Sequence, residues 1–397
     1  MLSDLARRLA LCAALLLPSF GCFERQHAPE GPGTLHPSVL RSGRHGGTLR
    51  AGTSYTELCR SNSTHVFWTD PQGEGKGSFQ PFSDAVSDSV QYLRRNIMPF
   101  DVPNLLTLGF PQNQDPGDEG PTPATHVPHR ITPAKGLLSA RQTMQLPDGL
   151  SDGIVNRTVH LALQTKVDYA WADSVPRHIF FEYISNYACA NEARTNWRPL
   201  FAGAVQRIIA AADVDVDHAR VEDIVAVISK EIYSALSPDP TKPIHFVTGC
   251  TPLIFDPMSV VAYGYASCTG MSIALAFALR AAGVPARLVG TPAWNGDPDL
   301  GNHNWVEVWT STASSGHGEA TGQWRILEGG DDSLEKDPCE RWFCNSKRFD
   351  GNTRVYATRL DRSLSNGTTY ALAWDAKNLD VPGEDRTRWY TEICSKC

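Results

Sequence analysis

The feature that most constrains the fold of this 397-residue chain is an apolar run that follows Cys268. Residues 273–279 read Ile-Ala-Leu-Ala-Phe-Ala-Leu, so they are apolar nearly all round a helix, which is typical of a helix buried in a core. Gly283 stands where a C-terminal helix cap is expected, and Pro285 prevents the helix from continuing. We therefore predict a buried helix over 268–282 whose first residue is a cysteine.

Strands are predicted after this helix. Residues 287–289 read as a short buried strand, and residues 303–309 alternate as a longer strand does. The side chains on one face of the longer strand are those of His303, Trp305, Glu307 and Trp309. Residues 323–327 are predicted to form the neighbouring strand. The loop between these two strands, 310–322, is polar and contains glycine, so we expect it to be exposed.

This arrangement suggests thiol chemistry. A thiol becomes a strong nucleophile only as the thiolate, which a helix N-terminus and a neighbouring imidazolium both favour. Cys268 at a helix start, His303 on one strand and a carboxylate on the next would supply a nucleophile, a base and an orienting group. Taken singly, such a cysteine is more often packed or disulfide-bonded, and such a histidine is more often structural. Their combination favours the catalytic interpretation.

The sequence around these residues resembles a known family. The cysteine-bearing helix, Gly-Val-Pro-Ala-Arg at 283–287 and His-Asn-Trp-Val-Glu-Val at 303–308 look like the core of the transglutaminase-like superfamily, which includes papain-fold thiol enzymes. The segment 180–200 looks like the helical lead-in of a microbial branch of that superfamily. The resemblance covers roughly 155–345 and is strongest over 264–309. It implies an α+β fold, with a papain-like transglutaminase core in which the cysteine helix packs on an antiparallel sheet, and a helical lead-in subdomain.

The resemblance also implies roles for individual residues. Cys268 would be the nucleophile and His303 its base. The third member of the family's triad is usually an aspartate, four residues after the tryptophan of the strand. Counting from Trp324 gives Glu328, which can orient the histidine with one more rotatable bond. Asp331 is the alternative third residue, and Asp332 lies equally close in sequence, so the third position stays open.

The implied reaction is acyl transfer or hydrolysis on the amides of a protein or peptide substrate, with no cofactor and no metal. Backbone N–H groups at the helix start, including that of Cys268, would form the oxyanion hole. The substrate-groove candidates are Tyr263, Tyr265, Trp294 and Trp305. Two other classes of protein stay open: an inactive domain that binds peptide or glycan in the same groove, and a disulfide-rich cell-surface structural protein in which Cys268 is paired.

The N-terminus predicts export. Residues 1–21 combine Arg7-Arg8, a short apolar run and small residues near the end, as a secretory signal peptide does. The apolar run is too short to span a membrane. We therefore expect a secreted or extracytoplasmic protein that meets a membrane only if Cys22, which directly follows this segment, is lipidated.

The cysteine count is consistent with export. Cys12 lies in the signal segment, so nine of the ten cysteines remain, and an odd number points to a free thiol. With Cys268 free, the other eight would suffice for four disulfides. The close pairs Cys339/Cys344 and Cys394/Cys397 also raise the alternative of a zinc site, although no nearby histidine completes one.

Composition divides the chain into regions. We predict a signal segment over 1–21, a loop-rich N-terminal region over 22–150, a transglutaminase-like domain over 151–350, with its lead-in over 151–240 and its core over 241–350, and a C-terminal extension over 351–397. Helices are predicted over 83–96, 154–166, 179–187, 197–212 and 221–235. The formal net charge of −7 is spread over interspersed acidic and basic residues, so it indicates no nucleic-acid partner.

Overall fold

The computed structural model describes residues 65–68, 78–104, 108–110, 153–239, 241–311, 322–331 and 333–397. The predicted signal segment, Cys22 and most of the predicted N-terminal region lie outside these residues, as does the loop 312–321. All the described residues belong to one unit, Tyr55–Cys397. Within the described ranges, no helix is both long enough and apolar enough to cross a bilayer.

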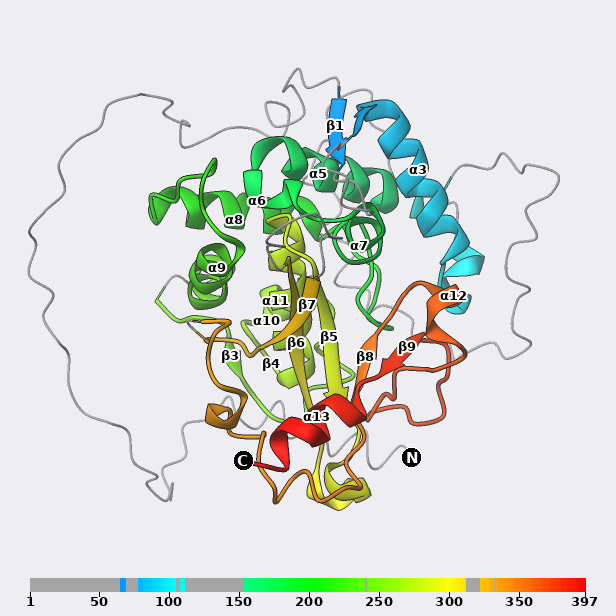
Figure 1. Ribbon diagram of the computed structural model, residues 1–397, viewed down its shortest axis with the longest axis vertical. Coiled ribbons are helices and arrows are strands. Elements are labelled where there is room, and N and C mark those ends of the chain that lie inside the picture. Colours follow the sequence, from blue (N-terminus) through cyan, green and yellow to red (C-terminus); the bar gives the residue numbers. More distant parts are fainter. Residues whose placement is uncertain are drawn as a thin grey trace, which may run out of the picture. The chain divides into compact units, whose positions relative to one another are not determined.

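A five-stranded antiparallel sheet forms the centre of this unit (Figure 1). Its strands lie in the order β7 (Gly322–Leu327), β6 (His303–Ser311), β5 (Ala286–Thr291), β8 (Tyr356–Thr358) and β9 (Gly383–Asp385). The predicted strands over 287–289, 303–309 and 323–327 correspond to β5, β6 and β7, with ends that differ by one or two residues. With helices beside an antiparallel sheet, the predicted α+β class is confirmed.

The helix α11 (Cys268–Ala281) is the predicted cysteine helix, and it packs on β5 and β6. Its C-terminus ends as predicted, because Gly283 adopts a φ of +73° and the Val284 N–H donates to the Leu279 carbonyl at 2.9 Å. At its N-terminus, a Cβ on Gly270 would lie 2.6 Å from the Cβ of Ala266. The absence of a side chain at Gly270 therefore lets the first turn of α11 approach the preceding strand closely.

The helical lead-in contains α5 (Ile154–Asp168), α7 (Arg177–Tyr183), α8 (Arg198–Ala211) and α9 (Val221–Ala235). The helix α9 has the predicted bounds, whereas α7 ends four residues before the predicted 187. After the end of α7, three backbone carbonyls accept hydrogen bonds from side chains, where a longer helix would supply backbone N–H groups. Arg198 donates to Ile184, Trp197 Nε1 donates to Tyr187 at 3.1 Å, and Arg280 Nη1 donates to Ala188 at 2.6 Å.

Several short elements complete the described part of the chain. Its other helices are α3 (Phe82–Arg95), α6 (Ala170–Asp173), α10 (Pro257–Tyr263), α12 (Arg362–Ser365) and α13 (Thr387–Cys394), and 3-10 turns span Pro99–Asn104, Trp294–Gly296, Pro298–Leu300 and Pro338–Glu340. Two small sheets pair β1 (His65–Trp68) with β2 (Ser78–Pro81), and β3 (His245–Phe246) with β4 (Tyr265–Ala266).

The residues beyond 350, predicted as a C-terminal extension, contribute strands to the central sheet. β8 pairs with β5, and β9 pairs with β8. The helix α13 packs against the face of the sheet that carries Trp305, whose Nε1 donates to the hydroxyl of Tyr390 at 2.7 Å. A boundary at 350 would therefore divide one continuous sheet.

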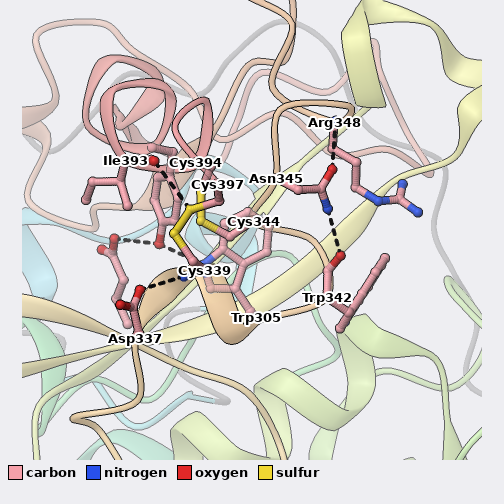
Figure 2. Close-up of a disulfide and its surroundings, with 12 residues drawn as sticks. Trp305, Asp337, Cys339, Trp342, Cys344, Asn345, Arg348, Ile393, Cys394 and Cys397 are labelled. Carbon is pink, nitrogen blue, oxygen red and sulfur yellow. Dashed lines mark hydrogen bonds between the residues drawn. A yellow bond between two sulfur atoms is a disulfide. The ribbon is translucent and has the colours of Figure 1, made fainter.

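Two disulfides tie α13 to the loop after β7. They join Cys339 to Cys397 and Cys344 to Cys394, so the four cysteines considered for a zinc site are paired across the two segments (Figure 2). Cys189 is a buried free thiol. The expectation that every cysteine other than Cys268 is available for a disulfide is therefore wrong at Cys189, which lies inside the core with no second sulfur bonded to it.

A buried ion cluster links the strands to α13. Arg287 on β5 lies opposite Glu307 on β6, and its Nε donates to Glu307 Oε2 at 2.9 Å with both side chains fully buried. Arg287 Nη1 also donates to Glu384 of β9 at 2.8 Å. Glu307 Oε1 accepts a hydrogen bond of 3.0 Å from the hydroxyl of Tyr390 on α13. The cluster therefore specifies which strands and helix meet at this face.

We predict that Glu307→Gln lowers the free energy of unfolding by about 3 kcal/mol, because it leaves the buried guanidinium of Arg287 with less compensating charge. Urea denaturation followed by circular dichroism measures the change. Glu392→Gln, which removes an exposed partner of Arg388 within α13, is the matched control and leaves the transition midpoint in place. Equal midpoints for Glu307→Gln and the unchanged protein would contradict the prediction.

Candidate active site

Cys268 is the first residue of α11 and directly follows the extended N-cap residue Ser267. Its thiol is free and partly exposed. The first backbone N–H groups of a helix have no acceptor within the helix, and they create a positive field at its N-terminus. The fold thus holds a free sulfur at the position where a helix most favours a thiolate.

His303 begins β6 and contacts both of its expected neighbours. Its Nε2 lies 2.7 Å from Oε1 of Glu328. Cys268 and the His303 side chain are close enough to shift one another's pKa, since His303 lowers the pKa of the thiol and Cys268 raises that of the imidazole. Because Nε2 already faces the carboxylate, the ring nitrogen that remains for the sulfur is Nδ1. The structure therefore brings the thiol, the imidazole and the Glu328 carboxylate into one line of contacts.

Strand register explains why Glu328 reaches the histidine. Val306 on β6 pairs with Leu327 on β7, and continuing this register by one residue sets Glu328 opposite Trp305. Directly opposed residues of antiparallel strands project to the same face, and His303 shares that face with Trp305. Glu328, four residues after Trp324, is therefore the carboxylate that contacts the His303 ring.

Asp331, the alternative third residue, has other partners. Its carboxylate pairs with Arg341, lies 3.2 Å from Lys336 Nζ and accepts a hydrogen bond of 2.8 Å from the Glu328 backbone N–H. The Asp331 N–H in turn donates to the Glu328 carbonyl at 3.0 Å. Asp331 thus closes the turn after β7 and holds the backbone of Glu328, and not the side chain of His303. Asp332 lies outside the described residues.

Asn304 is a site residue that our sequence reasoning missed. Its side chain donates to Thr269 Oγ1 at 2.9 Å and accepts from the hydroxyl of Tyr370. Its backbone and its side chain both act to lower the pKa of the Cys268 thiol. A Cβ on Gly290 would lie 2.3 Å from Asn304 Oδ1, so the strand opposite needs a glycine here. The clue in the sequence that could have identified Asn304 is its position directly between His303 and Trp305.

An aromatic cluster surrounds the imidazole ring. The ring centroid of His303 lies 4.7 Å from Trp342, 5.7 Å from Trp305 and 6.5 Å from Trp294. Trp305 is 0% exposed and Trp294 is 2% exposed. Both were expected to line a substrate groove. That expectation needs correction, because they pack behind the histidine and present almost no surface to a substrate.

The tyrosines before Cys268 lie nearer the surface. Tyr263, at the end of α10, is 54% exposed, and its ring centroid is 6.0 Å from that of Tyr265 on β4. Their role as groove residues stays a prediction. Trp342 was not among the candidates, although it is 52% exposed and in contact with His303. Its position between Cys339 and Cys344 is the sequence signal that could have drawn attention to it.

The local electrostatics favour the charged form of the thiol and of the imidazole. Burial acts to raise the pKa of Cys268, but hydrogen bonds and charge from His303, with hydrogen bonds from Asn304, lower it overall. Burial acts to lower the pKa of His303, whereas contacts with Cys268 and Glu328 raise it above its ordinary value. The arrangement therefore favours a thiolate beside an imidazolium more than an isolated cysteine and histidine would.

The carboxylate is held in its charged form as well. Burial acts to raise the pKa of Glu328, but His303, the indole of Trp342 and the charge of Arg341 lower it overall. An ionised Glu328 accepts a hydrogen bond from the Nε2–H of the ring, which keeps the tautomer and orientation of His303 constant. Within the described ranges, no group of three or more His, Cys, Asp or Glu side chains is arranged to hold a metal ion.

Comparison with known families agrees with this geometry. Residues 219–328 match the model of the transglutaminase-like superfamily, from the start of α9 to Glu328. The chain therefore contains a transglutaminase-like domain, as the resemblance in its sequence implies. The matched segment includes Cys268, His303 and Glu328. No curated protein and no solved structure matches the chain.

We predict that iodoacetamide alkylates Cys268 with a pH midpoint below the ordinary cysteine pKa of about 8.5. The lowered pKa keeps the thiolate populated as the pH falls through the range in which an ordinary thiol gains its proton. Mass spectrometry of quenched samples gives the rate at each site. Cys189, whose pKa burial raises to about 11, is the internal control and should react far more slowly. A midpoint at or above about 8.5 for Cys268 would contradict the prediction.

We also predict that Glu328→Gln lowers Cys268-dependent turnover by about two orders of magnitude or more, because a neutral amide no longer selects the required tautomer of His303. Asp331→Asn should lower turnover far less, since Asp331 acts on the turn. Initial rates, normalised to the folded fraction from circular dichroism, compare the two variants. The opposite ranking would show that the assignment of the third residue is wrong.

Proposed function

We propose that this protein is an exported transglutaminase-like thiol enzyme that carries out acyl transfer or hydrolysis on protein or peptide amides. The observation that carries the proposal is the line of contacts from Cys268 through His303 to Glu328. The thiol at one end lies on a helix N-terminus, and the carboxylate at the other is 2.7 Å from the ring. These are the nucleophile, the base and the orienting group that amide chemistry requires.

In the proposed first step, the Cys268 thiolate attacks the carbonyl carbon of the amide and forms a tetrahedral intermediate. Backbone N–H groups at the start of α11 stabilise the oxyanion. The intermediate collapses as the C–N bond breaks, and the His303 imidazolium gives its proton to the departing amine. The products of this step are the free amine, a neutral imidazole and a thioester between the acyl group and Cys268.

In the second step, an amine or a water molecule attacks the thioester carbonyl, and the neutral imidazole takes a proton from this attacking group. Collapse breaks the C–S bond and returns the thiolate, with the imidazolium beside it. An amine gives a new amide and water gives a carboxylic acid. Transferase and hydrolase therefore share every residue of the site and differ only in the acceptor that reaches the thioester.

The other classes of protein make different demands on Cys268. A structural protein with Cys268 in a disulfide is disfavoured, because this thiol is free. An inactive peptide-binding domain would need neither a polarised thiol nor an ionised carboxylate behind the histidine. The lowered pKa of Cys268 and the raised pKa of His303 favour the enzyme.

Export is the proposed setting for this chemistry. The signal-like segment over 1–21 supports it, and two disulfides join α13 to the loop after β7. Disulfides persist in oxidising compartments and are rare in the cytosol. Attachment to a membrane would require lipidation of Cys22, which mass spectrometry of the mature N-terminus can test.

The test offers the protein a glutamine-containing peptide together with a fluorescent primary amine. Wild-type protein should release the amide nitrogen as ammonia, and amine incorporation distinguishes transfer from hydrolysis. Cys268→Ala should abolish both products, since it removes the sulfur that forms the thioester. Cys189→Ala is the control with a buried thiol removed, and it should keep the activity. Product formation by folded Cys268→Ala would contradict the proposal.

A further inference from the structure

Trp342 shares a carboxylate oxygen with the histidine of the site. Its Nε1 donates to Glu328 Oε1 at 2.9 Å, and His303 Nε2 lies 2.7 Å from the same oxygen. The Trp342 ring also meets the imidazole edge-on, with centroids 4.7 Å apart and an interplanar angle of 62°. One side chain thus contacts both members of the histidine–carboxylate pair.

Burial alone does not explain the position of Trp342, because half of the side chain is exposed. Two other contacts orient it. Asn345 Nδ2 donates to the Trp342 carbonyl at 2.9 Å, as Figure 2 shows. The Arg348 guanidinium lies 4.8 Å from the centre of the Trp342 ring and 4.9 Å from that of Trp294. Trp342 is therefore held at its backbone carbonyl by Asn345, at one face of its ring by Arg348, and at its N–H by Glu328.

The two disulfides bracket this residue. Cys339 precedes Trp342 and bonds to Cys397, just beyond the end of α13, whereas Cys344 follows it and bonds to Cys394, the last residue of α13 (Figure 2). A 3-10 turn, Pro338–Glu340, begins this segment, and the residues from there to Cys344 form no helix or strand. Covalent links to a helix thus restrict a segment whose own regular hydrogen bonding is sparse.

The length of the Glu328 side chain explains why a second hydrogen-bond donor matters. A glutamate has one more rotatable bond than an aspartate, and the Glu328 side chain is partly exposed. A carboxylate with that freedom loses more conformational entropy when it is held toward one donor. A second donor on the same oxygen narrows its rotation and excludes water from that position.

We propose that Trp342 is a positioning residue that holds Glu328 toward His303, and that the disulfides Cys339–Cys397 and Cys344–Cys394 keep its indole in place. This inference rests on the thiol function proposed above. Trp342 acts through Glu328 and donates no proton to the reacting atoms. The disulfide-bonded loop is thereby part of the support of the candidate active site, in addition to its effect on stability.

A double-mutant cycle tests the inference. Trp342→Phe removes the indole N–H and keeps an aromatic ring, and it should slow both turnover and alkylation of Cys268 at neutral pH by about 10-fold, as expected for one lost hydrogen bond to a charged group. In the Glu328→Ala background, the same change should alter either rate by less than about 2-fold. Trp389→Phe, on α13 and outside these contacts, is the matched control.

The disulfide arm uses Cys339→Ser combined with Cys397→Ser, with near-ultraviolet circular dichroism to confirm folding. This variant should slow the two reactions in the same direction as Trp342→Phe, and combining the two changes should add less than about 2-fold. It also provides a second measurement should Trp342→Phe fold poorly.

The outcomes separate the two levels of inference. Full independence of Trp342→Phe and Glu328→Ala, or unchanged rates in Trp342→Phe, would overturn the positioning role while leaving the thiol chemistry in place. A Cys268 that reacts no faster than an ordinary cysteine in the unchanged protein, with no turnover, would instead remove the proposed function and this inference together.

Discussion

The antiparallel pairing of β5, β6 and β7 is the constraint on which the rest of the site depends. It carries His303 on β6 and brings Glu328, which follows β7, to the same face. The buried helix α11 packs on the sheet and presents Cys268 from its N-terminus. Because α11, β5 and β6 are buried nearly throughout, core packing holds the elements that carry Cys268 and His303, with a precision that a mobile loop could not match.

The C-terminal part of the chain supports this core at the edge of the sheet and on the face that carries His303 and Trp305. β8 and β9 extend the sheet, and α13 covers Trp305 and hydrogen-bonds to the buried ion cluster of Arg287 and Glu307. The disulfides then join α13 to the loop that carries Trp342. The same elements that fill the core therefore also surround His303, so changes that destabilise the core are expected to disturb the candidate active site.

Burial has opposite outcomes for the free thiols of Cys189 and Cys268. Cys189 lies inside the core, where burial raises its pKa and the thiol stays protonated. Cys268 is also largely enclosed, yet His303 and Asn304 stabilise its thiolate and reverse the effect of burial. The difference comes from the polar and chargeable neighbours of Cys268, which is how a protein makes one cysteine reactive and leaves another inert.

Much of the core could be predicted from local pattern. The apolar run after Cys268, its Gly283 terminus and the alternation from His303 follow the periods of a helix and a strand, so these elements could be predicted from local pattern. Glu328 was one of the candidates for the third residue, named from the spacing that the family resemblance implies, and it is the one that contacts the histidine. Tertiary structure decided what depends on distant segments: the partners of Asp331, the burial of Trp294 and Trp305, the two nested disulfides, and the approach of Trp342. Local periodicity specifies which face a residue occupies, whereas the neighbour that covers that face is set by how the whole chain packs.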